Sequence, residues 1–134
     1  MNPAEPLPPE LSPFAELVAS RKAWIQDVLI PWCRTANVPS LIKAESEWGD
    51  IAGRIDPQFS LWLWAWSRFS VLYVEGLKGL DETYPVSVTL RDGTTFRGYP
   101  DSRASSRVGL ILADESSGES IGPLKLDQIE SITR

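Results

Sequence analysis

The sequence has no histidine and only one cysteine, Cys33, among its 134 residues. Without histidine, the Ser-His and Cys-His pairs that activate most nucleophiles cannot be built. A single cysteine excludes an intramolecular disulfide and a zinc site made of cysteines alone. Cys33 beside Arg34 is a candidate thiol of lowered pKa, although a small, partly buried structural cysteine is far more common. The chain also lacks a glycine-rich phosphate loop, so we expect a protein that is not an enzyme and holds no cofactor or metal.

An excess of basic residues and a long apolar run are missing too. The formal net charge is −5, and acidic residues outnumber basic ones in both residues 1–80 and residues 81–134. Neither part is therefore a nucleic-acid module by bulk charge. No apolar stretch reaches the roughly 18 residues that span a bilayer, and the start has no basic segment followed by an apolar run. We expect a cytoplasmic protein with no membrane association, and the lone cysteine suits a reducing compartment.

The last third of the chain carries the pattern of short β-strands. Val86, Val88 and Leu90 alternate with polar residues, which places one face of a strand in a core. Asp92-Gly93 suits a type I′ hairpin turn, in which both central residues have positive φ. The second strand, Thr95 to Tyr99, contains a glycine at position 98, which is typical of a bulge or a sharp bend.

Three more strands follow in the same style. The predicted segments are a polar loop over Pro100–Arg107, a strand over Val108–Ala113, a turn over Asp114–Gly118, a strand over Ser120–Leu126, one helical turn over Leu126–Ile129 and a last strand over Ile129–Thr133. Pro123 has no N–H to donate, so its strand is expected at an edge or interrupted there. A closed barrel would leave no open edge, and we predict that these five strands close.

This stretch resembles the Sm-like and SH3-like small barrels and, more closely, the Rho-binding antiterminator (Rof-like) family. The resemblance lies in the segment VTLRDGTTF, in Asp101 at the start of the polar loop, in the Val108–Leu112 strand, in Gly118-Glu119 and in the ending LKLDQIESI. It covers roughly the last 50 residues and leaves most of the helical part outside. Rof-like proteins bind the termination factor Rho and block its RNA site, so the resemblance implies a protein partner. An acidic small barrel suits that role, because it can complement a basic surface.

The part before the barrel is predicted to be helical after a proline-rich arm over residues 1–12. Ser12-Pro13 is a typical helix start, and an amphipathic stripe from Phe14 to Leu29 is expected to be buried until Pro31 ends the helix. Ser40 can cap a second helix, Leu41 to about Arg54.

Asp56-Pro57 begins a third, tryptophan-rich helix. Its run FSLWLWAW could also form a buried strand, because periodicity alone does not separate the two for a short apolar run. Residues 70–75 are ambiguous between helix and strand, and two glycines then lead into the barrel. Tryptophan is enriched at interfaces, so Leu61 and Trp64 are candidates for a docking or dimer face; the alternative is that these rings are core.

The polar loop between the second and third strands is the candidate contact region. In Sm-like proteins this loop contributes to RNA contact, so the resemblance implies a site there, and arginine suits contacts with phosphates and base planes. The loop contains no aromatic residue on which a base could stack, which favours a plain surface loop. The candidate partner-binding or RNA-binding residues are Arg91, Arg97, Asp101, Ser102, Arg103 and Arg107.

The sequence thus predicts an α+β protein with a flexible arm at 1–12, a three-helix region at 13–80 and a five-stranded antiparallel Sm/SH3-like barrel at 81–134. We expect an interaction module related to transcription that binds a protein, with Rho as the candidate that the resemblance suggests. The alternative is an RNA-binding Sm-like module that uses the loop between barrel strands two and three. A homo-oligomer through the tryptophan-rich helix or a barrel edge is a further candidate assembly.

Overall fold

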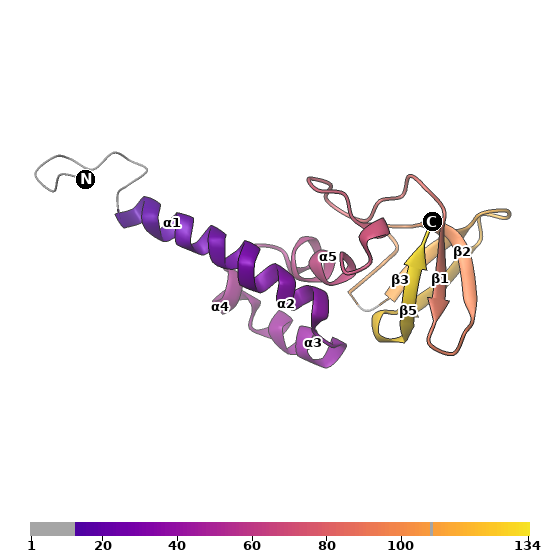
Figure 1. Ribbon diagram of the computed structural model, residues 1–134, viewed down its shortest axis with the longest axis horizontal. Helices are drawn as coiled ribbons and strands as arrows, with labels where there is room; N and C mark the ends of the chain where they lie inside the picture. The colour runs from indigo at the N-terminus through magenta and orange to yellow at the C-terminus, as the bar shows by residue number, and fades with distance from the viewer. Residues whose placement is uncertain (1–12, 108) are drawn as a thin grey trace, which may run out of the picture. The chain divides into compact units, whose positions relative to one another are not determined.

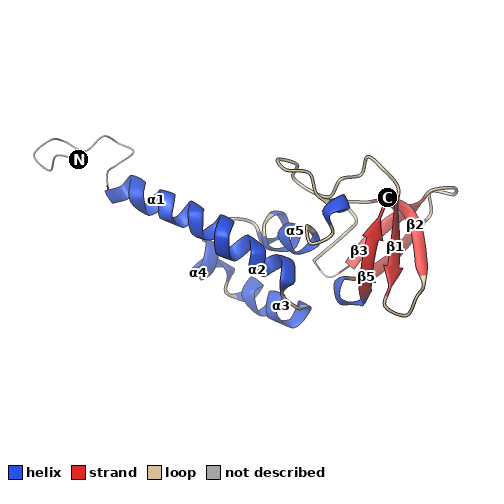
Figure 2. Cartoon of the chain, in the orientation of Figure 1, coloured by secondary structure: helices blue, strands red, loops and turns tan. Residues whose placement is uncertain are grey.

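The computed structural model describes residues 13–107 and 109–134, so the predicted arm at 1–12 and Val108 lie outside it. The chain divides into two compact units, of which the first is described over residues 13–32 and the second is Cys33–Arg134. Helices are followed by a five-stranded antiparallel sheet, as Figure 2 shows by colour. The protein is therefore α+β, as the sequence predicts.

The first helix does not end at Pro31. α1 (Pro13–Trp24) is followed directly by a π-helical segment (Ile25–Leu29) and by α2 (Ile30–Thr35). The N–H of Ile30 donates to the carbonyl oxygen of Ile25, five residues earlier. This wider turn just before Pro31 accommodates the proline ring, so the helix continues. The predicted buried stripe is also wrong in part, because Leu17 and Val28 are exposed.

The second unit begins with short helices. α3 (Val38–Ser46) and α4 (Trp48–Ala52) replace the single helix predicted from Leu41 to Arg54, so the prediction of three helices is wrong in this respect. The cap of α3 is Asn37 and not Ser40, because Asn37 Oδ1 accepts the Ser40 N–H at 2.9 Å.

The aromatic run is helical rather than extended. A 3₁₀ turn (Pro57–Phe59), α5 (Leu61–Trp66) and a second 3₁₀ turn (Ser70–Leu72) follow each other along the chain. Asp56 caps the first turn as predicted, since its Oδ1 accepts the Gln58 N–H at 2.9 Å. Leu61 is fully buried, so this residue belongs to the core and offers nothing to a partner. Trp64 is half-buried, and its ring meets that of Trp48 edge-on with 6.1 Å between centroids.

The sheet follows the predicted strands closely. The strand order is β4-β3-β2-β1-β5, and Figure 1 shows β1 between β2 and β5. The strands are β1 (Val86–Leu90), β2 (Thr95–Pro100), β3 (Gly109–Asp114), β4 (Ser120–Lys125) and β5 (Ile129–Thr133), with a 3₁₀ turn (Leu126–Gln128) before β5. The buried valines of β1 lie on one face, because residues two apart on a strand point to the same side.

The first hairpin does not use the predicted type I′ turn. Only Gly93 has positive φ, at 90°, while Asp92 does not. The Leu90 carbonyl accepts the Gly93 N–H at 2.9 Å, and the Leu90 N–H donates to the Thr94 carbonyl at 2.8 Å. This is a three-residue loop with a left-handed glycine at its end. Asp92 stabilises it through a 2.9 Å bond from the Thr94 N–H.

The predicted closed barrel is wrong, because β4 and β5 are not paired with each other and form the two edges of an open sheet. Two local features of β4 accompany its open edge. Pro123 has no N–H to donate to a ladder, and the β3–β4 ladder shifts register between Leu110 and Leu112. The predicted edge position of Pro123 is confirmed. Gly98 allows β2 and β3 to lie close together, because a Cβ at this position would overlap the carbonyl oxygen of Ala113 on β3.

Candidate functional site

Two of the arginines predicted to bind a partner are already paired with carboxylates of the same chain. Arg97 Nε lies 2.8 Å from Glu115 Oε2, and its Nη1 donates to Ser87 Oγ at 2.9 Å. Arg107, in the loop between β2 and β3, pairs with Glu45 of α3. A ligand would have to displace these carboxylates, so both arginines are better explained as structural.

Glu45 links the loop to the helices, a role that the sequence did not suggest. One of its carboxylate oxygens accepts the indole N–H of Trp62, and the other accepts from Arg107. Trp62 is almost fully buried, so its N–H needs this acceptor inside the protein. One half-buried carboxylate therefore holds a core ring and a surface loop together.

Asp101 and Ser102 shape the loop instead of facing outward. Asp101 Oδ1 accepts the Ala104 N–H at 3.0 Å, and its carbonyl accepts the Ser105 N–H at 2.9 Å. Ser102 Oγ accepts the Leu80 N–H at 2.9 Å. The Ser102 N–H donates to a carboxylate oxygen of Glu82 at 2.9 Å. These bonds fix the loop to the segment that precedes the sheet.

Arg103 is exposed and borders a hollow of about 510 Å³. The loop itself has no aromatic residue, but Phe59 and Lys78 line the same hollow. The Phe59 side chain is 54% exposed, enough to present a ring face. The sequence could not place this ring beside Arg103, because the two residues are far apart along the chain.

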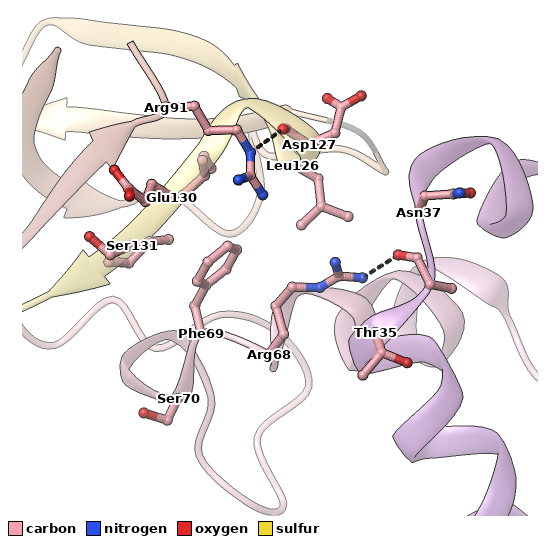
Figure 3. Close-up of a pocket in the computed structure, with 13 residues that line it drawn as sticks. Thr35, Asn37, Arg68, Phe69, Ser70, Arg91, Leu126, Asp127, Glu130 and Ser131 are labelled. Carbon is pink, nitrogen blue, oxygen red and sulfur yellow. Dashed lines mark hydrogen bonds between the residues drawn. The ribbon is translucent and has the colours of Figure 1, made fainter. Parts of the chain in front are cut away.

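A second hollow lies in Cys33–Arg134 between β5 and the segments that follow α2 and α5, a cleft of about 570 Å³ (Figure 3). Three segments line it, together with Arg91 from the first hairpin: residues 35–37 after α2, residues 68–70 after α5, and residues from Leu126 to Ile132 around β5. Of the predicted candidates, only Arg91 lies here, and we call this hollow the β5 cleft.

Arg68 is the half-buried cation of the β5 cleft. Its Nε donates to the Ala65 carbonyl at 2.8 Å, and its Nη2 donates to the carbonyls of Cys33 and Ala36 at 2.9 and 2.7 Å. These carbonyls lie at helix ends, where intrahelical partners run out. Burial lowers the pKa of the Arg68 guanidinium from its ordinary value, but an arginine remains charged at neutral pH.

Arg91 faces Arg68 from the sheet. Its Nε donates to the backbone carbonyl of Asp127 at 3.0 Å. Figure 3 shows Arg91 reaching into the cleft from the sheet and Arg68 on the opposite side, its guanidinium held toward the segment after α2, with the ring of Phe69 nearby and the Asp127 carboxylate turned away. Within residues 13–107 and 109–134, neither guanidinium forms an ion pair with a carboxylate.

The remaining chemistry of the described residues is plain. Burial raises the pKa of the Cys33 thiol to about 12, so this residue is not a thiolate at neutral pH and the predicted reactive alternative loses its support. In the described part of the chain, no group of three His, Cys, Asp or Glu side chains could hold a metal ion. Its helices are all too short or too polar to cross a bilayer.

No protein-family model, no curated protein and no solved structure matches this chain. The kinship with Rho-binding antiterminators therefore stays a prediction that rests on the quoted segments.

The sequence analysis missed Arg68 and Phe69, although a signal for Arg68 was present. Arg68 is the only charged residue between Asp56 and Glu75, inside the most aromatic stretch of the chain. A lone cation in an apolar run must find buried acceptors or a ligand, and here it finds backbone carbonyls.

Proposed function

We propose that this protein is a non-enzymatic interaction module that binds a protein partner, in the manner of the Rho-binding antiterminators that its last strands resemble. The observation that carries the proposal is the open edge of β5, which lines a cleft of about 570 Å³. An exposed strand edge with unpaired N–H and C=O groups is a template for another chain.

The strand order supports the small-barrel kinship. Successive strands β1 to β4 pair in a meander, and β5 returns to pair with β1. Only a β4–β5 ladder separates this sheet from a closed five-stranded barrel. An acidic net charge of −5 also suits a partner with a basic surface, such as one that binds RNA.

The test is direct binding of the purified full chain to purified Rho, measured by biolayer interferometry and by competition with RNA for binding to Rho. We expect saturable binding that weakens with salt, because complementary charge is part of the interface. Absence of binding at roughly 10 μM, a concentration that corresponds to about 7 kcal/mol, would remove Rho as the partner. If cross-linking in cells then yields no stable partner either, the interaction module is contradicted.

RNA binding is the second candidate, and one observation favours it. Phe59, Lys78 and Arg103 border one hollow, so a ring and two cations are available to a single-stranded nucleotide. Fluorescence anisotropy with a labelled single-stranded RNA tests this at low and moderate salt. A phosphate contact would give affinity that falls steeply with salt, and Phe59→Ala would weaken it about tenfold, since stacking is worth about 1–3 kcal/mol per base.

A further inference from the structure

The two cations of the β5 cleft have acceptors but no counter-charge. Arg68 and Arg91 donate only to backbone carbonyls, and each keeps N–H groups for which no described acceptor is found. A guanidinium fork matches a carboxylate in shape and charge. A carboxylate that enters the cleft would therefore gain two cationic donors without displacing an existing ion pair.

The cleft also offers a strand edge. Four consecutive residues of β5, from Ile129 to Ile132, line it. The β1–β5 ladder shifts register between Thr89 and Leu90, which leaves Glu130 as an extra residue on β5, and the cleft extends along this edge strand through that irregular step. The other edge of β5 is paired with β1. An extended peptide can add to the free edge through main-chain hydrogen bonds.

The charge around the cleft selects a peptide over a polyanion. Glu130 lines the cleft and is exposed, and the whole chain has a net charge of −5. A nucleic-acid backbone would bring a row of phosphates past Glu130 and an acidic surface, and like charges in close contact disfavour binding. One acidic side chain on an otherwise neutral strand meets the arginines and avoids that repulsion.

We infer that the β5 cleft binds an extended segment of a protein partner, with one aspartate or glutamate of that segment between Arg68 and Arg91 and its backbone along β5. The ring of Phe69 then packs against an apolar neighbour of the acidic residue. This inference rests on the proposed function, because it names the chemistry by which a partner is held.

The test uses the full chain and two capped peptides of about seven residues, the length of a typical strand. The first carries one central glutamate between valines and threonines, and the second has glutamine in its place. Binding is followed by amide chemical shifts in two-dimensional NMR. We expect the glutamate peptide to shift the amides of Glu130 and Ser131 and to bind about tenfold more tightly than the glutamine peptide, because charge-assisted bonds are roughly twice as strong as neutral ones.

Variants assign the effect to the cleft. Arg91→Gln should weaken the glutamate peptide about tenfold and leave the glutamine peptide unchanged. The matched control is Arg97→Gln, which lies on the same hairpin but outside the cleft and should change neither affinity. Arg68→Lys tests the contribution of Arg68. The lysine keeps the positive charge and part of the hydrogen bonding, so the test does not depend on a variant that removes the charge and fails to fold.

Other results overturn the inference. Equal binding of the two peptides, or an Arg91→Gln variant that binds like the wild type, removes the carboxylate site. If inorganic phosphate or a single-stranded oligonucleotide shifts the cleft amides at lower concentration than the glutamate peptide, the ligand is a phosphate and not a peptide.

The outcome is separable from that of the proposed function. A partner that binds the wild type and Arg91→Gln equally contradicts the cleft and keeps the interaction module. If the cleft binds the peptide but no protein partner is found, the carboxylate site is kept and the interaction module is contradicted.

Discussion

Two surfaces of the second unit carry exposed or half-buried arginines, and they differ in what neutralises them. On the loop between β2 and β3 and the adjoining strand, Arg107 and Arg97 face carboxylates of Glu45 and Glu115. In the β5 cleft, Arg68 and Arg91 face only backbone carbonyls. The difference teaches that an arginine identified in the sequence is a binding candidate only where no carboxylate of the folded chain already pairs with it.

The largest effect is expected from removing the half-buried cation of the cleft. Arg68→Ala leaves the carbonyls of Cys33, Ala36 and Ala65 without their donor, and we expect the free energy of unfolding to fall by about 3 kcal/mol. Denaturant unfolding followed by circular dichroism measures this change. Arg54→Ala, at an exposed position, is the control and should change stability by less than about 0.5 kcal/mol. A small effect of Arg68→Ala would mean that this residue serves a ligand alone.

On the loop surface, Glu45→Ala should cost about 2 kcal/mol. It leaves the buried indole N–H of Trp62 without an acceptor, and an unsatisfied buried donor costs about 1–3 kcal/mol. Glu47→Ala is the matched control, because Glu47 is an exposed glutamate two residues further along, in the turn between α3 and α4. Loss of Arg107 alone should cost less than about 1 kcal/mol, since its pair with Glu45 is partly exposed. Equal costs for the two partners would contradict the central role of Trp62.

Acid should distinguish the two surfaces. Near the loop, hydrogen bonds from Thr83, with a smaller contribution from the Arg134 charge, hold the pKa of Asp81 below its ordinary value of 3.8. Because the folded-state pKa is lowered, this stabilisation is complete above the ordinary value and is lost as the pH falls through the lowered one. The cost of Asp81→Asn, about 1 kcal/mol at pH 7, should therefore decrease as the pH falls below 3.8.

The contacts of Arg68 do not titrate in this range, because their acceptors are carbonyls. The cost of Arg68→Ala should stay constant over the same pH series, measured by urea unfolding at each pH. A parallel decline of both costs would show that the two surfaces lose stability together and would break the comparison.

The smallest effect is expected from the exposed pair of Arg97 and Glu115. Both side chains are nearly half exposed, at 43% and 45%. Such surface pairs contribute about 0.2–1 kcal/mol, so a double-mutant cycle should give a coupling at the low end of this range. A coupling above about 1 kcal/mol would mean that this pair orders the hairpins around it.

The sequence predicts the strands well because their signals are local. Alternation sets β1, and the Asp114 to Gly118 turn is confirmed by the 2.9 Å bond from the Gly118 N–H to the Asp114 carbonyl. Closure of the sheet into a barrel is not a local property. It depends on whether β4 and β5 come close enough to pair, and no short sequence pattern determines the distance between these two strands. The type I′ prediction fails for a similar reason, since Asp-Gly is also compatible with a longer loop that needs one positive φ.

The same distinction between local and long-range information applies to the candidate site. The sequence identifies Arg91 and the loop arginines as cations, but their partners come from residues distant along the chain, as the pair of Arg107 and Glu45 shows. The prediction that Pro31 ends the helix is wrong because a π-helical turn before this residue accommodates the proline ring. Leu61 and Trp64 differ in exposure although both lie on α5, and only packing decides which ring or side chain is covered.

The carboxylate of Glu45 gives the protein an optical reporter. Because the indole of Trp62 and the guanidinium of Arg107 share this one acceptor, detachment of the loop changes the electrostatic environment of a buried chromophore. The chain contains six tryptophans, so occupancy of the loop by a macromolecule would appear as a partial shift of their summed emission, without a label.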